Sequence, residues 1–209
     1  LLVTGGVGYL GSRLVRELPK HPDFADEPVR IYDNLRQPRF HSLWELPPEG
    51  NYEIVEADIR DLNELEDAME DVTTVFHLAA ITNAPETFDI PDKTFEVNYQ
   101  GALNVYDAAV EAGVDRFVYV STCSVYGQTE EEITESHPCE PESPYGEAKH
   151  KAEQELLRRA IEDPTGVSAL RLGTVYGWTR GMRFDTVVDK FAHLAATDQP
   201  LSVYKGADD

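Results

Sequence analysis

Cysteine is scarce in this sequence, which has only Cys123 and Cys139 among 209 residues. The two could pair with each other, but a disulfide-stabilised scaffold needs more of them, so the count indicates a reducing compartment. Long apolar runs are also missing. None approaches the roughly 20 residues that a helix needs to cross a bilayer, and no signal peptide is visible. We therefore expect a cytoplasmic protein that does not enter a membrane.

Positive charge is the second shortage. The chain has 18 basic against 39 acidic residues and a net charge of −21. Nucleic acids and anionic membrane surfaces would be repelled, so neither is expected as a partner. The excess of acid is consistent with a cationic partner or with a solvated acidic surface of the kind that halophilic proteins carry. The second interpretation is the simpler one, because the acidic residues are spread along the chain.

Short apolar runs alternate with helical patterns along the chain. The runs are continuous and mostly rich in β-branched or aromatic residues, as buried parallel strands are. The alternation predicts an α/β fold with a doubly wound parallel sheet that binds its ligand at the carboxyl ends of the strands. The expected strands are Val29–Tyr32, Tyr52–Val55, Val72–Leu78, Phe117–Val120 and Val167–Leu172, and the expected helices are Leu10–Leu18, Leu62–Met69, Thr94–Ala112, Tyr145–Ile161 and Phe184–Ala196.

A second, smaller lobe is expected to begin near the C-terminus. Residues 1–177 predict one domain, and residues 178–209 predict the start of a small C-terminal substrate lobe with a strand at Leu201–Tyr204. We expect the remainder of that lobe to lie beyond Asp209, and the first strand to begin before Leu1.

The opening stretch, Leu1–Gly11, passes from an apolar strand through a glycine turn into a helical pattern. Gly6, Gly8 and Gly11 fit G-x-G-x-x-G, and Gly5, Gly8 and Gly11 fit T-G-x-x-G-x-x-G. One glycine permits a tight turn, the next lets the backbone approach a pyrophosphate, and the third lets the helix pack on the sheet. The helix start offers free N–H groups to that phosphate. The alternative is a glycine turn that only packs, but the flanking strand and helix favour a dinucleotide site.

An acidic residue stands where such a site needs one. Asp33 lies 22 positions after Gly11 (33 − 11) and closes the second apolar run. A carboxylate there can accept hydrogen bonds from the adenosine ribose hydroxyls, and it would repel a 2′-phosphate, so it favours NAD over NADP. Arg36 nearby could accommodate that phosphate, which keeps an NADP-dependent enzyme open.

The stretch from Ser143 to Lys149 predicts a helix that carries a tuned tyrosine. Ser143 suits an N-cap and Pro144 the first helical position. Tyr145 and Lys149 are four residues apart and therefore share one helix face. A neighbouring ammonium would lower the pKa of the tyrosine and allow proton transfer with a substrate hydroxyl. Taken alone, such a pair is more often a core ring beside a solvated amine.

Hydroxyl side chains follow the strand Phe117–Val120 in the segment Ser121–Gly127. This position places them at the carboxyl edge of the sheet, facing the expected cofactor crevice. The alternative role is local capping and turn hydrogen bonding, which is frequent for Ser and Thr at strand ends.

Seven motifs occur in a recognisable order along the chain. They are Thr4–Gly11, Tyr32–Leu35, Asp58–Asp61, His77–Ala80, Asn98, Ser121–Gly127 and Tyr145-x-x-x-Lys149. In this order the chain resembles the extended short-chain dehydrogenase/reductases, specifically the NAD-dependent nucleotide-sugar epimerases and dehydratases. The resemblance covers nearly the whole chain and implies a Rossmann-type sheet with NAD as cofactor.

The resemblance also implies roles for individual positions. Lys149 would hold the nicotinamide ribose as well as tune Tyr145, and Thr122 would hydrogen-bond the reacting sugar oxygen. Ser124 is a second candidate substrate contact, and His77 is interpreted as structural rather than as a proton-transfer group. The implied cofactor-binding residues are Gly5, Gly8, Tyr9 and Leu10 at the pyrophosphate, Asp33 and Asn34 at the adenosine ribose, Asp58 and Ile59 at the adenine, Leu78, Ala79 and Ala80 beside the middle of the cofactor, and Asn98, Tyr145 and Lys149.

The segment Arg171–Gly177 departs from the family pattern. Thr174 stands where several relatives have an Asn that contacts the sugar nucleotide, which leaves the identity of the substrate open. Arg183, a little further on, is either a substrate contact or a surface cation.

The activity implied by the resemblance is nucleotide-sugar epimerisation. Tyr145, Lys149 and Thr122 would be catalytic, hydride would pass from the sugar to NAD to leave a transient 4-keto sugar, and it would then return. The alternatives are a nucleotide-sugar dehydratase, an NADP-dependent aldehyde or ketone reductase and, from another class, a non-catalytic dinucleotide-binding module. A homodimer is expected by analogy, with Thr94–Ala112 and Tyr145–Ile161 at its interface. No metal is expected.

Overall fold

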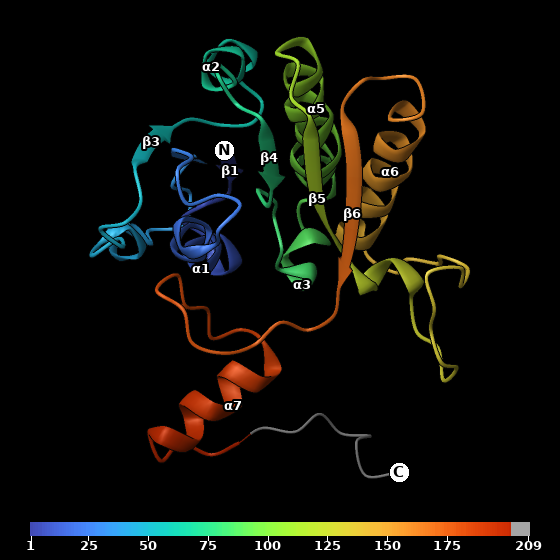
Figure 1. Cartoon of the computed structure of the whole chain (residues 1–209). Helices are drawn as coiled ribbons and strands as arrows, with labels where there is room; N and C mark the ends of the chain where they lie inside the picture. The colour runs from blue at the N-terminus through green and yellow to red at the C-terminus, as the bar shows by residue number, and fades with distance from the viewer. Residues whose placement is uncertain (202–209) are drawn as a thin grey trace.

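Parallel strands form a single sheet in the computed structural model, which describes residues 1–201. The strand order is β3-β2-β1-β4-β5-β6, so the chain winds outward in one direction from β1 and in the other from β4. The crossovers between these strands carry the helices (Figure 1), and the predicted doubly wound sheet is confirmed. The strands are β1 (Leu2–Thr4), β2 (Val29–Asp33), β3 (Tyr52–Glu56), β4 (Thr74–His77), β5 (Arg116–Thr122) and β6 (Gly166–Leu172).

Each predicted helix has a counterpart, with shifted ends. Those of eight residues or more are α1 (Tyr9–Glu17), α5 (Gly101–Glu111), α6 (Pro144–Arg159) and α7 (Val187–Ala196). The shorter segments are α2 (Leu62–Ala68), α3 (Ala84–Thr87), α4 (Pro91–Phe95), the 3₁₀ turns η1 (Leu18–Lys20), η2 (Phe40–Leu43) and η4 (Cys123–Tyr126), and the π-helical turn η3 (Glu96–Gln100).

Two cores form because neighbouring residues of a strand point to opposite faces of the sheet. Leu2 packs into a core covered by α2, α5 and α6, whereas the next residue, Val3, packs into a core covered by α1. The first core also holds Leu65, Tyr106 and Leu156 from its three helices. The sheet is therefore clamped between two layers, which fixes where the strand ends lie.

The prediction of one continuous helix over Thr94–Ala112 is wrong, because the helix is interrupted. Its first turns belong to α4 and the π-helical turn η3, and α5 begins only at Gly101. Asn98 lies in η3, where its amide accepts from the Ile81 N–H at 2.7 Å and donates to the Ile81 carbonyl at 2.9 Å. This pairing holds the wide turn against the loop that follows β4. Periodicity alone does not reveal such an insertion.

The segment after β6 turns back across α1 before α7 begins (Figure 1). The Tyr9 hydroxyl lies 2.7 Å from the Gly177 carbonyl oxygen and 2.8 Å from a carboxylate oxygen of Asp189 in α7. Ser12 of α1 contacts Thr179 through their hydroxyls at 2.7 Å. Helix α7 begins three residues later than predicted. The predicted strand at Leu201–Tyr204 falls, beyond its first residue, outside the described residues, and the domain boundary at 177 remains a prediction.

Replacing Tyr9 by Phe tests this attachment. Asp189 is buried, so loss of the tyrosine hydroxyl leaves a carboxylate oxygen short of a partner, and we expect the free energy of unfolding to fall by about 1–3 kcal/mol. Urea unfolding measures the change. Tyr176→Phe is the matched control, because that ring is 66% exposed. Equal stability of the two variants would show that the contact does not hold the segment.

Candidate active site

A cleft of about 1000 Å³ opens at the carboxyl ends of the strands. The reversal of strand order between β1 and β4 places the crevice there, because the chain leaves these two neighbours in opposite directions. Its walls come from the turns that follow all of the strands and from the start of α6. The cleft is lined by all of the predicted site residues except Asn98.

The glycine turn forms one wall. Gly5 has φ 70°, a left-handed conformation, and a Cβ there would lie 2.7 Å from the Ala79 nitrogen. A Cβ on Gly11 would lie 2.2 Å from the Gly5 carbonyl oxygen, so only glycine lets α1 start this close to the turn. Gly8 is the N-cap of α1 and offers no side-chain cap. The first N–H groups of α1 therefore face the cleft, an arrangement that suits a pyrophosphate.

Asp33 lines the cleft at the end of β2, where the ribose contact is predicted. Its carboxylate already accepts hydrogen bonds from the Val7 N–H at 3.1 Å and the Leu35 N–H at 2.9 Å. Burial raises the pKa of Asp33, and these two backbone donors oppose that effect. Each carboxylate oxygen keeps a free lone pair, so the group can still accept from ribose hydroxyls.

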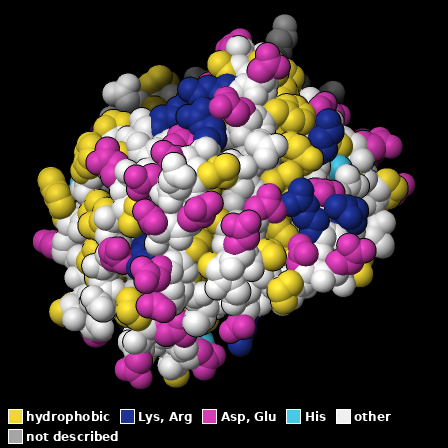
Figure 2. Space-filling model, turned by 90° about the horizontal axis from the view of Figure 1, so that it is seen from above, with side chains coloured by type: hydrophobic (Ala, Val, Ile, Leu, Met, Phe, Trp, Pro, Cys, Tyr) yellow, Lys and Arg dark blue, Asp and Glu magenta, His cyan; other side chains and the backbone are white. Residues whose placement is uncertain are grey.

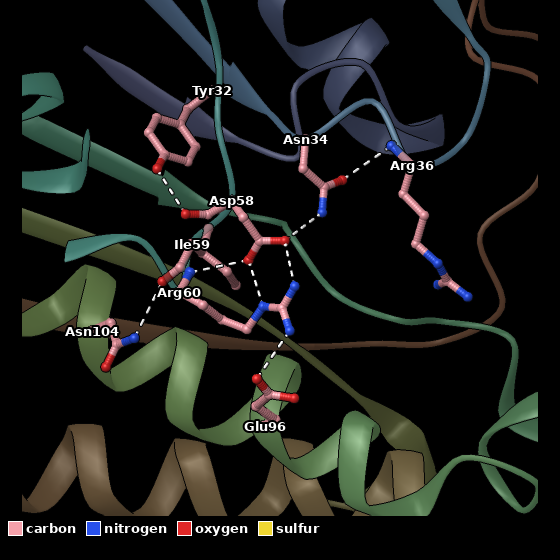
Figure 3. Close-up of polar contacts among 8 residues, drawn as sticks. All are labelled: Tyr32, Asn34, Arg36, Asp58, Ile59, Arg60, Glu96 and Asn104. Carbon is pink, nitrogen blue, oxygen red and sulfur yellow. Dashed lines mark hydrogen bonds and ion pairs between the residues drawn. The ribbon is translucent and has the colours of Figure 1, made fainter. Parts of the chain in front are cut away.

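A polar cluster forms the far end of the same wall (Figure 3). Arg60 donates to both oxygens of Asp58, at 2.8 Å from Nε and 3.0 Å from Nη2, and its other nitrogen reaches Glu96 at 2.9 Å. The Asn34 amide donates to the same carboxylate at 2.8 Å. The bond with Arg60 lowers the pKa of Asp58 to about 2. Asn34 and Asp58 thus brace each other beside Ile59 in the cleft.

The opposite wall begins with helix α6. The Ser143 hydroxyl accepts from the Gly146 N–H at 3.1 Å and Pro144 is the first helical residue, which confirms the predicted helix start. Tyr145 and Lys149 both line the cleft. Lys149 is 2% exposed, and its Nζ lies 4.0 Å above the Tyr119 ring. Burial lowers the pKa of Lys149 to about 7.

The predicted pKa of Tyr145 is wrong in direction. Burial raises the pKa of the phenol, and this effect outweighs the two that lower it, a hydrogen bond with Thr122 and the positive charge of Arg183. Burial lowers the pKa of Lys149 itself to about 7, so the amine is already neutral over the range in which the phenol titrates and contributes little to the pKa of Tyr145. Desolvation cannot be read from the four-residue spacing of the two side chains.

Thr122 serves both of the roles that the sequence allows. Its Oγ1 accepts from the Ser124 N–H at 3.1 Å, which caps the turn η4, and its hydroxyl lies 3.1 Å from that of Ser124. Both side chains also line the cleft beside Tyr145. Capping therefore holds Thr122 in place without removing it from the site.

The loop after β6 closes the cleft from the side. Arg183 lines the cleft with a side chain that is only 17% exposed, so it is not a free surface cation. It pairs with Asp185 through two bonds, the shorter at 2.5 Å, and donates to the Thr82 hydroxyl at 3.0 Å. Thr174, in the same loop, also lines the cleft. Arg183 thereby links the loops that follow β6 and β4.

Asn98 and His77 lie behind the cleft. Asn98, predicted among the cofactor-binding residues, is buried and holds the Ile81 backbone. His77 is fully buried, contacts the Thr4 hydroxyl through Nδ1 at 2.8 Å, and stacks on Phe117 and Tyr119. Burial keeps its pKa well below the ordinary value, so the ring is neutral, in accord with a structural role.

The charge of the cleft differs from that of the chain. Acidic side chains are scattered over the surface in Figure 2, among a few small basic groups. In the cleft, six basic residues outnumber four acidic ones. Sequence reasoning missed three of these basic residues, because the sequence around an isolated Arg or Lys does not show which way its side chain points. The six are Arg36, Arg39, Arg60, Lys93, Lys149 and Arg183.

The described part of the chain shows no group of three side chains that could hold a metal ion. None of the helices within residues 1–201 is long and apolar enough to span a bilayer.

Residues 1–208 match the model of the NAD dependent epimerase/dehydratase family. The chain belongs to this family. It is 31% identical to the low-salt glycan biosynthesis protein Agl12 of Haloferax volcanii. That alignment of 206 residues covers 98% of this chain and 65% of Agl12. It is 34% identical to the UDP-glucose 4-epimerase of Rhizobium meliloti, over 95% of this chain and 52% of the relative. A double mutant of DesIV, a dTDP-glucose 4,6-dehydratase from Streptomyces venezuelae solved with NAD bound, superposes with a TM-score of 0.89 and 29% identity, over 98% of this chain and 64% of that one.

These comparisons confirm the family resemblance, its NAD dependence and the fold class. The chain spans less than two thirds of the length of each of these relatives. An epimerase and a dehydratase both occur among them, so membership defines the class of chemistry and not the individual reaction.

Acidification tests the cluster around Asp58. Its pKa of about 2 in the folded protein lies below the ordinary value of 3.8, so its contribution to stability is complete above the higher value and is lost as the pH falls through the lower one. We expect Asp58→Asn to reduce the free energy of unfolding by about 2 kcal/mol more at pH 6 than at pH 2. Urea unfolding across this range measures the difference. The exposed Asp26→Asn is the control, and a difference independent of pH would contradict the ion pair.

Proposed function

We propose that this chain carries the cofactor-binding and catalytic part of an NAD-dependent nucleotide-sugar epimerase. The observation that supports it best is the placement of Tyr145, Lys149 and Thr122 on the cleft wall opposite the glycine turn. A protein that only binds a dinucleotide has no use for a buried amine beside a tyrosine and a threonine. This argues against the non-catalytic module.

The glycine turn and β2 would hold the cofactor. Close approach is possible at Gly5 and Gly8, free N–H groups at Tyr9 and Leu10 suit the pyrophosphate, and Asp33 suits the ribose. Farther along the cleft the proposed contacts are Asn34, Asp58 and Ile59 at the adenosine end, and Leu78, Ala79 and Ala80 beside the middle of the cofactor. When bound, NAD supplies the acceptor for a hydride from the sugar carbon.

Three residues of this chain would carry out the proton transfer with the sugar hydroxyl. Tyr145 takes the proton of the sugar hydroxyl at its phenolic oxygen and returns it when the sugar is reduced again, which leaves a 4-keto sugar between the two steps. Thr122 has a single hydroxyl proton: with Tyr145 as its partner it stabilises the phenolate, and with a sugar bound it donates instead to the reacting sugar oxygen. Lys149 in its charged form stabilises the same phenolate.

Epimerisation fits this wall better than dehydration does. Loss of water from a sugar needs an acid that protonates the departing hydroxyl and a base that removes a carbon-bound proton. Thr122, the last residue of β5, and Cys123 and Ser124 after it supply hydroxyl and thiol groups to the cleft and no carboxyl group. The dehydratase remains the second candidate because DesIV superposes closely.

A nucleotide sugar is the substrate that we propose, because its diphosphate suits a cleft in which basic side chains predominate. Ser124, Thr174 and Arg183 are the proposed contacts to it. We also propose a cytoplasmic homodimer. Helices α5 and α6 pack side by side (Figure 1), and exposed apolar side chains of α6 and its C-terminal end, Leu157 and Ile161, are available to a second copy.

Replacing Tyr145 by Phe is the experiment that tests the function. The change removes the proton acceptor and little volume, so we expect kcat to fall by about 10²–10⁴-fold while the affinity for NAD stays the same. Turnover of UDP- and dTDP-sugars followed by chromatography, with calorimetric titration of NAD, measures both. The exposed Tyr176→Phe is the control. Retained turnover in Tyr145→Phe would overturn the assignment, and no turnover of any sugar by the wild type would favour the binding module.

Thermal protection separates NAD from NADP. Asp33 faces the ribose position, and Arg36, the side chain best placed to bind a 2′-phosphate, is engaged by Glu86 at 2.5 Å. We expect NADP to bind about tenfold more weakly than NAD or worse, and to raise the melting temperature less at equal concentration. Stronger protection by NADP would favour the reductase.

A further inference from the structure

Helix α6 presents a third polar side chain in line with the two in the cleft. Tyr145, Lys149 and Glu153 occupy successive turns and therefore one face of the helix. Glu153 is 2% exposed and does not line the cleft. A carboxylate this deeply buried needs compensating partners.

Two neighbouring strands supply those partners. The Ser121 hydroxyl of β5 donates to Oε2 of Glu153 at 2.5 Å. Arg171 of β6 donates to Oε1 of Glu153 from Nη2 at 2.5 Å and from Nε at 2.9 Å. Ser121 and Arg171 are register partners at the ends of their strands. Glu153 thus joins α6 to the strand residue that immediately precedes Thr122.

Arg171 extends this network to the surface. Its Nη1 donates to the Tyr126 hydroxyl at 2.8 Å and to the Glu135 carbonyl at 3.1 Å. Because all of its nitrogens are engaged, Arg171 is held beside Glu153 as a permanent positive charge. Glu153, one turn beyond Lys149 on α6, is thus buried and paired with an arginine whose side chain is 20% exposed.

Few other charged groups near Lys149 could shift its pKa. On β4, His77 is neutral, and on β5 burial keeps the pKa of Tyr119 well above its ordinary value. On α6 the titratable neighbours are Tyr145, whose pKa is raised, Glu153, and His150, whose pKa is lowered by burial. Glu153 is the carboxylate that opposes the effect of burial on the pKa of Lys149.

We propose that the buried pair Glu153–Arg171 sets the charge of Lys149, and that Glu153 is thereby a positioning residue for the Tyr145 proton transfer. With both charges present, the arginine offsets part of the effect of the carboxylate, and Lys149 is balanced between its charged and neutral forms. Removal of the carboxylate leaves Lys149 facing an uncompensated arginine, which favours the neutral amine. Removal of the arginine frees the carboxylate to act on Lys149, which favours the ammonium.

The two substitutions therefore have opposite effects, which a purely structural role would not produce. We expect Glu153→Gln to lower the pKa of Lys149 by about one pH unit and Arg171→Gln to raise it by about one pH unit. The pKa is measured from the pH dependence of the Cε chemical shift in protein with ¹³C-labelled lysine, and the signal is assigned with Lys149→Arg. Glu147→Gln, which removes an exposed charge from the same helix, is the matched control.

Conservative variants separate charge from packing. Glu153→Asp and Arg171→Lys retain the charges, so the pKa of Lys149 should stay near the wild-type value even where the stability falls. Where Arg171→Gln fails to fold, Glu153→Gln against Glu153→Asp decides the question. Equal pKa values of Lys149 in the wild type and Glu153→Gln, or shifts in the same direction in both charge-removing variants, would overturn the proposal.

The inference rests on the proposed function only for its consequence in turnover. If turnover requires Lys149 in its charged form, kcat falls as the pH rises through the pKa of Lys149. This alkaline limb of the pH profile should therefore move to lower pH in Glu153→Gln and to higher pH in Arg171→Gln. The NMR titration needs neither substrate nor turnover. A Lys149 that titrates as expected in a protein that turns over no nucleotide sugar would contradict the proposed function and leave the charge pair intact.

Discussion

The close approach of α1 to the turn after β1 is the constraint on which the site depends. The backbone at Gly11 passes so near the Gly5 carbonyl that no side chain fits between them. This contact brings the N-terminus of α1 to the carboxyl edge of the sheet, beside the reversal of strand order between β1 and β4. A helix start with free N–H groups and a crevice between diverging crossovers therefore coincide. The geometry that suits a pyrophosphate is a consequence of backbone packing.

Burial controls the chemistry of the opposite wall. Lys149 and Tyr145 lie where desolvation disfavours the charged form of each, so it lowers the pKa of the amine and raises that of the phenol. At neutral pH the phenol is therefore protonated and Lys149, with a pKa of about 7, is divided between its two forms, while nearby groups compensate for part of the desolvation of each charged form. Thr122 and Arg183 do so for the phenolate, and Glu153 does so for the ammonium. The environment of these residues, more than their identity, therefore determines which of them carries a charge near neutral pH.

Local signals account for what the sequence predicts well. Ser143 and Pro144 act within one helical turn, and apolar runs reveal buried strands directly, so the start of α6 and the doubly wound parallel sheet could be expected. Features that depend on distant partners could not. The π-helical turn follows from the pairing of Asn98 with Ile81, and the tether of Tyr9 depends on Asp189, 180 residues away. The direction of the Tyr145 pKa likewise needs the burial of the folded site.

The segment after β6 makes the two walls interdependent. Arg183 donates to Thr82 on the loop after β4, and Asp189 accepts from the hydroxyl of Tyr9, the first residue of α1. The same segment contributes Thr174 to the cleft. A shift of this segment would therefore alter the charge near Tyr145 and the packing around the glycine turn together. The positive charge of Arg183 lowers the pKa of Tyr145, so any movement of Arg183 changes how readily Tyr145 gives up its proton.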